Sequence, residues 1–501
     1  MDEQRIETYM NLIQDFLARS DVKIEEIVQQ HSELVDDGLL LVMALFAVDF
    51  QEKGQTEKAA FLAQLRSQLS DFLGLKSSAE ENNEIPNMEF RLFNQESHKF
   101  VWKLLHYVDR EKGNPHTVYP FFEKHVAQLN LGFLWELPQV VTRWLEGKNA
   151  ERQQSIAWTV FRFGNLILQF PLGNRLINLE LAKIAYEQAL QVWTRSNFPE
   201  QWAMAQNNLA SVYRKRIKGD RADNLEQAIR LYEQVLQVWT RSNFPEQWAI
   251  AQHNLANVYR DRREGDRAVH VERSIRLYQQ ALQVWTRSNF PEQWAMAQNS
   301  LAITYQYHIQ GNPTVNLERA FDLYQQALRV YTQVKFPQNW AQIQCNLANL
   351  YLNSRFPGDR KVNLEQAIYY YKRALQVLTR SAFPQDWAGT QNNLAAAYSD
   401  RLSGDPEENL ERSIHYNEQA LQVHTIDTLP ADCLFTSRNL GNLHFTAGNW
   451  HDAATAYETA LAANDKLRSW AAHEDRRQAV QNEVAEVYAN LVHCYVHLNR
   501  Y

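Results

Sequence analysis

The sequence predicts an all-α protein: a right-handed α-solenoid of tandem 46-residue helix-turn-helix repeats, preceded by an N-terminal helical cap. The string VWTRSNFPEQWA recurs unchanged at 192–203, 238–249 and 284–295. Its proline keeps a spacing of 46 or 47 residues, at Pro199, Pro245, Pro291, Pro337, Pro384 and Pro430. A glycine follows the same period, at Gly173, Gly219, Gly265, Gly311, Gly358 and Gly404. Such periods are typical of arrays in which each unit buries its apolar face against its neighbours.

Each repeat is predicted to contain two helices, A and B. The proline suits the first turn of helix A, because its missing N–H would be unpaired there. An apolar stripe at intervals of three and four follows, and the glycine then permits a left-handed turn. Helix B is predicted to begin at an asparagine N-cap, and these caps are Asn224, Asn316, Asn363 and Asn409. No stretch alternates long enough to predict a strand.

The composition is that of a soluble, cytoplasmic protein. The 501 residues are 45% hydrophobic with a formal net charge of −7, and there is no basic tract of the kind that binds nucleic acid. The longest apolar stretch, 39–48, is far shorter than the ~20 residues of a membrane span. Cys345, Cys433 and Cys494 have no paired spacing, which favours a reducing compartment. We therefore expect neither nucleic acid nor a membrane as a partner.

The seventh repeat resembles the tetratricopeptide repeat. That family places small residues where its two helices cross, and the matching residues are Leu440, Gly441, His444, Gly448, Ala453, Tyr457 and Ala460. Earlier repeats carry about six further residues between the helices, such as KGDRAD at 218–223, so we interpret them as long-loop variants. The resemblance implies that one face of helix A lines a concave groove that binds a peptide or protein partner.

Four regions are predicted along the chain. They are an N-terminal helical region at 1–76, a polar linker at 77–88, a helical capping region at 89–151, and the solenoid at 152–501. The solenoid holds about seven repeats and an incomplete eighth. Because the eighth repeat matches helix A alone, its apolar face is predicted to be open and available for self-association.

A wider resemblance covers nearly the whole chain. The segments 171–210 and 32–69 resemble bacterial proteins in which tetratricopeptide repeats precede a CHAT domain, a caspase-like peptidase module. This chain reaches Tyr501 without a segment that resembles the CHAT domain. The resemblance implies an alternative function: the regulatory or sensor arm of a CHAT peptidase whose catalytic domain lies beyond Tyr501 or on another chain.

The sequence predicts no catalysis, cofactor or metal. A cysteine–histidine dyad of the caspase kind lies at strand ends, and no strand is predicted. His493 and His497 are four residues apart and flank Cys494, but a further ligand on that helix face is not evident. Phosphate-binding glycine motifs are also absent. We therefore expect a binding protein.

The candidate binding residues follow the face of helix A opposite its apolar stripe. Asparagine recurs there although it costs up to about 0.7 kcal/mol in a helix interior relative to alanine. One interpretation is functional, because a carboxamide can hold the backbone of an extended peptide through its donor and its acceptor. The other is duplication, with the carboxamides bonding only between adjacent helices. The candidates are Asn207, Asn208, Ser211, Arg214, His253, Asn254, Asn257, Arg260, Asn299, Asn346, Asn349, Asn392, Asn393, Arg438, Asn439 and Asn442.

The tryptophans are interpreted as core. Trp193, Trp239 and Trp285 close helix B, and they are predicted to fill the junction between repeats. A second set opens helix A and is predicted to be buried as well. These residues are Trp202, Trp248, Trp294, Trp340 and Trp387.

Overall fold

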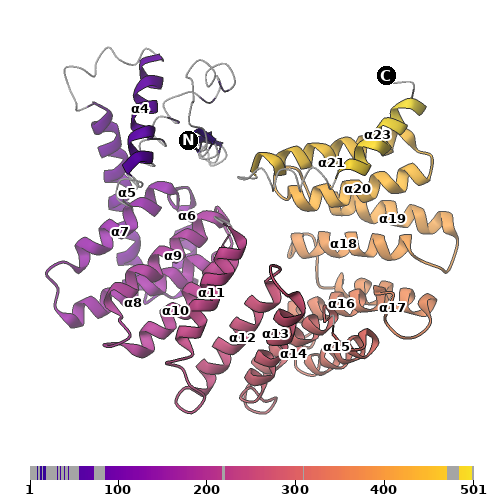
Figure 1. Cartoon of the computed structure of the whole chain (residues 1–501), viewed down its shortest axis with the longest axis horizontal. Coiled ribbons are helices and arrows are strands. Elements are labelled where there is room, and N and C mark those ends of the chain that lie inside the picture. Colours follow the sequence, from indigo (N-terminus) through magenta and orange to yellow (C-terminus); the bar gives the residue numbers. More distant parts are fainter. Residues whose placement is uncertain are drawn as a thin grey trace. The chain divides into compact units, whose positions relative to one another are not determined.

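The structure is a computed structural model, and it describes residues 56–72, 85–216, 220–308, 310–470 and 484–498 with scattered positions between 8 and 43. Every regular element in these residues is helical, which confirms the predicted all-α repeat fold. The described helices, labelled in Figure 1, fall into two compact units: α4 to α7 with the first residues of α9 in one, and α8 with the rest of α9 and the helices that follow in the other. No helix in the described ranges combines the length and the hydropathy needed to cross a membrane.

Between residues 56 and 145, the described part of the first unit contains four helices and a short 3-10 turn. Its elements are α4 (Thr56–Phe72), α5 (Ile85–Arg110), α6 (Pro115–Lys124), η2 (Val126–Gln128) and α7 (Leu131–Leu145). Aromatic rings fill the space between α5, α6 and α7, as where Phe100 meets Phe133 at 5.8 Å. The predicted linker lies outside the described residues up to position 84, and its last residues belong to α5.

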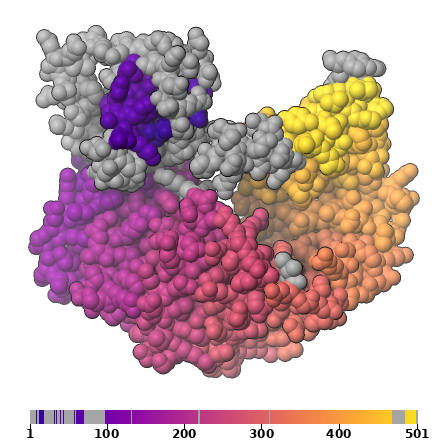
Figure 2. Space-filling model, viewed as in Figure 1, coloured from indigo at the N-terminus to yellow at the C-terminus, as the bar shows by residue number. Residues whose placement is uncertain are grey.

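The second unit is a series of helix pairs. The A helices are α8 (Ala150–Gln169), α10 (Pro199–Lys215), α12 (Pro245–Asp261), α14 (Pro291–Gln306), α16 (Pro337–Leu352), α18 (Pro384–Ser399), α20 (Pro430–Thr446) and α23 (Ala485–His497). The B helices are α9 (Arg175–Val192), α11 (Arg221–Val235), α13 (Arg267–Leu282), α15 (Pro313–Ala327), α17 (Arg360–Ala374), α19 (Pro406–Leu421) and α21 (Trp450–Trp470). Consecutive A helices from α8 to α18 touch, and side chains fill the space between these successive repeats (Figure 2).

The predicted start of helix A is confirmed in six repeats, where the first residue of the helix is the periodic proline. The loop glycines also behave as predicted where they are described. Gly265, Gly311, Gly358 and Gly404 have φ between 79° and 104°, a region that favours glycine. Gly219 lies outside the described residues.

The predicted N-caps of helix B are wrong by one turn. The capping residue lies four positions earlier, and in five repeats its side chain accepts a hydrogen bond from a backbone N–H of the first turn. These caps are Asp220, Asp266, Asn312, Asp359 and Asp405. Aspartate is favoured at this position because its side chain accepts these hydrogen bonds and its negative charge is stabilised by the positive end of the helix dipole.

The asparagines predicted as caps have another role in the loop. Asn224, Asn316, Asn363 and Asn409 are buried in the first turn of helix B. In the last three the amide donates back to a loop carbonyl, for example from Asn409 to Ser403 at 2.8 Å. An aspartate has no N–H to donate and could not close the loop in this way.

The junctions between repeats are built as predicted around the first tryptophan set. Trp193, Trp239 and Trp285 are at most 4% exposed. Of the second set, only Trp340 is buried, whereas Trp202, Trp248, Trp294 and Trp387 are half-buried. An arginine covers the open side of two of these rings, because Arg195 lies 5.8 Å from Trp202 and Arg241 lies 5.9 Å from Trp248. The second set is therefore a partly exposed edge of the core.

Candidate protein-binding face

The predicted binding residues lie on the A helices, and nine of the sixteen belong to two rows, which we call together the A-face. The first row contains Asn208, Asn254, Ser300, Asn346, Asn393 and Asn439. The second row lies three residues further along each helix and contains Ser211, Asn257, Ile303, Asn349, Ala396 and Asn442. The members of each row are 46 or 47 residues apart, so each row crosses successive A helices.

The second row is tied to helix B of the same repeat. A tyrosine hydroxyl from helix B donates to the asparagine oxygen in three repeats: Tyr278 to Asn257 at 2.8 Å, Tyr371 to Asn349 at 2.5 Å, and Tyr457 to Asn442 at 2.7 Å. Asn165 of α8 accepts from Tyr186 at 2.8 Å in the same way. These tyrosines are fully buried, so the asparagine supplies the acceptor that the hydroxyl has lost from water.

The pairing is broken at Ile303 of α14, although helix B of that repeat keeps the tyrosine. Ile303 stands where an asparagine would accept, and the buried hydroxyl of Tyr324 has no hydrogen-bond partner among the described residues. Burial raises the pKa of Tyr324 well above its usual value. The fourth repeat therefore keeps the tyrosine and its packing without the polar contact.

The pairing predicts opposite results for one substitution at two sites. Tyr278→Phe removes the donor to Asn257 and the acceptor of Arg260, and should lower the free energy of unfolding by about 1–3 kcal/mol. Tyr324→Phe removes an unsatisfied buried hydroxyl and should leave stability unchanged or raise it by up to about 1 kcal/mol. Urea unfolding of the two variants tests this, and equal losses would contradict the assignment.

Three asparagines of the first row donate hydrogen bonds to asparagines of the preceding A helix. The amide of Asn208 donates to Asn165 at 2.9 Å, that of Asn254 to Asn207 at 3.3 Å, and that of Asn346 to Asn299 at 3.1 Å. The expectation that these residues point away from the core is corrected here. Candidates at most 9% exposed are Asn207, His253, Asn257, Asn346 and Asn392. Asn207, His253 and Asn346 meet polar residues of an adjacent A helix, whereas Asn257 bonds to Tyr278 of its own repeat.

The first row is different on α18 and α20. The side chains of Asn393 and Asn439 are half-buried and have no hydrogen-bond partner among the described residues. Space lies beside them, since a Cβ added at Gly389 would meet nothing within 4 Å and Ala396 is exposed. Phe435 of α20 is 47% exposed, and the guanidinium of Arg438 lies 5.3 Å from its ring. This end of the A-face is open.

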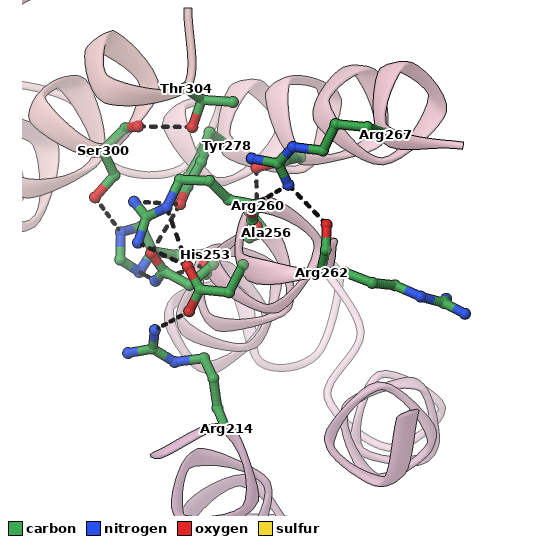
Figure 3. Close-up of polar contacts among 12 residues, drawn as sticks. Arg214, His253, Ala256, Arg260, Arg262, Arg267, Tyr278, Ser300 and Thr304 are labelled. Carbon is green, nitrogen blue, oxygen red and sulfur yellow. Dashed lines mark hydrogen bonds and ion pairs between the residues drawn. The ribbon is translucent and has the colours of Figure 1, made fainter. Parts of the chain in front are cut away.

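A buried histidine, His253, lies on α12 next to the first-row residue Asn254 (Figure 3). The Nδ1 atom of His253 lies 3.3 Å from the amide nitrogen of Asn257, and its Nε2 lies 3.3 Å from the hydroxyl of Ser300. An amide nitrogen can only donate, so Nδ1 accepts and Nε2 carries the proton that is donated to Ser300. Burial, with the positive charges of Arg260 and Arg214, lowers the pKa of His253 to about 3. The histidine is therefore neutral and joins α12 to α14.

Two arginines share one aspartate beside this histidine. Arg214 at the end of α10 donates to Oδ2 of Asp261 at 2.7 Å. Arg260 of α12 approaches Oδ1 of the same carboxylate at 3.4 and 3.5 Å, and also donates to the Tyr278 hydroxyl at 3.3 Å. Figure 3 shows Arg214 reaching toward this group from the neighbouring helix. The carboxylate therefore bridges two guanidinium groups.

The described residues offer no group of three or more candidate metal ligands. His493 and His497 are exposed on α23 and their Nε2 atoms are 3.0 Å apart, while the ring of His497 stacks on Trp450 at 4.2 Å. The three cysteines are buried and unpaired. Burial raises the pKa of Cys345 to about 11, which leaves its thiol protonated and unreactive.

The sequence interpretation missed the tyrosines that hold the second row. Their signal was present, since tyrosine recurs in helix B at the same period, at Tyr186, Tyr232, Tyr278, Tyr324 and Tyr371. The bonding of each tyrosine to helix A depends on the distance between two helices within a repeat, and that distance cannot be read from the spacing of residues.

Comparison with known families identifies the repeats. The tetratricopeptide-repeat model matches residues 202–246 and 248–292, and the Sel1-repeat model matches 295–329 and 341–376. The chain therefore contains tetratricopeptide and Sel1 repeats, which are typical of scaffolds for protein–protein interaction. No curated protein matches the chain.

Several solved structures are similar to this chain at low sequence identity. A signal transduction ATPase (STAND) protein with a tetratricopeptide repeat sensor from Pyrococcus horikoshii is 13% identical, with a TM-score of 0.45 over 96% of this chain and 69% of that one. The apo form of RapI is 15% identical, with a TM-score of 0.42 over 62% and 98%. A Rap protein complexed with Competence and Sporulation Factor is 12% identical, with a TM-score of 0.41 over 75% and 99%.

Proposed function

We propose that the chain is a non-catalytic scaffold whose A-face binds an extended segment of a partner protein. The observation that carries this proposal is the open end of the A-face on α18 and α20. There, Asn393 and Asn439 have half-buried carboxamides with no hydrogen-bond partner among the described residues. The repeat families found in the chain support a partner of this kind.

The chemistry of this surface suits a peptide backbone. A carboxamide offers a donor and an acceptor together, so it can pair with a peptide group whatever the neighbouring side chain is. Gly389 and Ala396 leave room for a backbone to approach α18 closely. The exposed ring of Phe435 supplies apolar surface on the next A helix.

The test blocks this surface without disturbing the fold. Gly389→Leu places a side chain in open space, and should abolish binding while helix stability rises by about 1 kcal/mol. The double variant Asn393→Ala/Asn439→Ala should weaken binding about thirtyfold, through the loss of two hydrogen bonds worth about 1 kcal/mol each. Ligands are selected from phage-displayed random 15-residue peptides on the wild-type chain, and affinities are measured by fluorescence anisotropy.

The control for this test is Asn363→Ala. Asn363 closes the loop before α17, so its loss should lower the melting temperature and leave the affinity unchanged. Selected peptides that bind Gly389→Leu as tightly as the wild type would overturn the proposal.

The resemblance of 171–210 and 32–69 to CHAT-linked proteins favours a second candidate, in which the scaffold relays binding to a CHAT peptidase in cis or in trans. An α/β domain bearing His and Cys, encoded in frame after Tyr501, would favour this candidate. Self-association is a further proposal for the last described helix. On α23, Tyr488, Val492 and Val496 are 44–61% exposed at intervals of four residues.

A further inference from the structure

Two exposed histidines meet on the last described helix, α23. His493 and His497 are four residues apart, so they are neighbours on one face of the helix. Their Nε2 atoms are 3.0 Å apart, so the lone pair of one ring accepts the N–H of the other. Both side chains are exposed, and an ion from solvent can therefore reach the two nitrogens. This helix carries no residue of the two A-face rows, so the pair is separate from the proposed function.

Aromatic rings hold both imidazoles in this position. The ring of His497 stacks on Trp450 of α21 at 4.2 Å, with an angle of 8° between the two planes. The ring of His493 lies 5.7 Å from the same indole and 5.2 Å from Phe445 of α20. Stacking accounts for the position of each ring, but it does not require the two Nε2 atoms to converge. The same contacts reduce the side-chain freedom that would be lost when the rings bind a ligand.

The distance between the two nitrogens suits a metal ion. Zinc binds an imidazole nitrogen at about 2.0–2.1 Å. Two such nitrogens are about 2.8–3.4 Å apart when the angle between them at the metal is about 90–110°. The observed separation of 3.0 Å lies within this range. The two rings can therefore chelate one ion once the proton between them leaves.

We propose that His493 and His497 form a binding site for a divalent late transition metal ion of the Cu²⁺, Ni²⁺ and Zn²⁺ group, with water at the remaining coordination positions. Imidazole suits these ions, whereas Mg²⁺ and Ca²⁺ prefer oxygen ligands. Cys494 follows His493 in the chain but is buried, and burial raises the pKa of its thiol. The thiol is therefore no ligand at this surface, and the imidazoles alone select the ion.

Isothermal titration calorimetry of the full chain with Zn²⁺, Cu²⁺ or Mg²⁺ tests the proposal. Histidine occurs at 15 positions, so the site is identified by the difference between variants. The wild type should bind Cu²⁺ more tightly than Zn²⁺, and Mg²⁺ should give no binding at this pair. His493→Gln/His497→Gln should bind one metal ion fewer than the wild type. His497→Gln alone should weaken binding at least about tenfold, because the second imidazole of a chelate binds at a high effective concentration.

The matched control is His415→Gln/His451→Gln, which removes two exposed histidines of α19 and α21 and should leave the number of bound ions at the α23 pair unchanged. Circular dichroism melts check that each variant folds. A second measurement uses the wild-type chain, in which saturating Zn²⁺ should protect His493 and His497 from diethyl pyrocarbonate, as read by peptide mass spectrometry. The same number of bound Zn²⁺ ions in His493→Gln/His497→Gln as in the wild type, or equal modification of the pair with and without Zn²⁺, would overturn the metal site.

Discussion

Replacing Trp285 by alanine should lower the free energy of unfolding by about 3–5 kcal/mol, the largest effect expected of a single substitution in this chain. The ring is 1% exposed and packs among Ala249, Ala281 and Ala297 of three successive helices. Small neighbours cannot expand to fill the cavity, so the loss should approach the upper end of the range for large-to-small changes. Urea unfolding followed by circular dichroism measures it.

The effect of Trp285→Ala should also be local in origin. Each repeat of a solenoid is stabilised by its nearest neighbours, so weakening one junction should separate the unfolding of the repeats before it from that of the repeats after it. A broadened or two-step transition is the expected result. Val334→Ala is the control, since Val334 is 92% exposed and its loss should not change the transition. A wild-type-like transition for Trp285→Ala would show that the junction contributes little.

Acid should destabilise the protein through His253. The pKa of this histidine is about 3 in the folded chain against about 6.5 in the unfolded chain, so below pH 6.5 the unfolded state binds one more proton. The stability is therefore complete above pH 6.5 and is lost as the pH falls toward 3. The loss should be about 1.4 kcal/mol per pH unit, or roughly 2 kcal/mol at pH 5.

His253→Asn isolates this contribution, because asparagine occupies the equivalent position in three other repeats, at Asn207, Asn299 and Asn392. The difference in free energy of unfolding between variant and wild type should change by about 2 kcal/mol between pH 7 and pH 5. The pKa of His424 is also lowered by burial, but it remains in both proteins and cancels in this difference. A pH-independent difference would show that His253 titrates normally.

Periodicity predicted the fold because it depends on features that recur in every repeat. The proline start of helix A, the left-handed glycines and the buried tryptophans each have one physical reason, and it holds repeat after repeat. The N-cap of helix B was predicted wrongly because two polar residues four positions apart are both suitable as the cap. Only the fold shows that Asp220 accepts from the first turn while Asn224 is buried inside it.

The sequence predicted which positions form the candidate face. It could not predict which of these residues bond to a neighbouring helix and which have no such partner. Asn208 and Asn393 hold the same place in their repeats, yet one donates to a neighbouring helix and the other has no such partner. Asn208 has a partner because Asn165 of the neighbouring repeat lies beside it, whereas Asn393 has open space beside it at Gly389 of its own helix. Such pairings join positions more than 40 residues apart, and the pattern within one helix does not contain them.

The identical junctions at 192–203, 238–249 and 284–295 have a consequence for how the gene can change. Recombination between two copies adds or removes 46 residues, and the new boundary is again the same tryptophan-filled junction. The number of repeats can therefore change without creating a junction of a new sequence. Each such event still shifts which A-face residues become neighbours, so ligand preference can diverge while the joints between repeats stay the same.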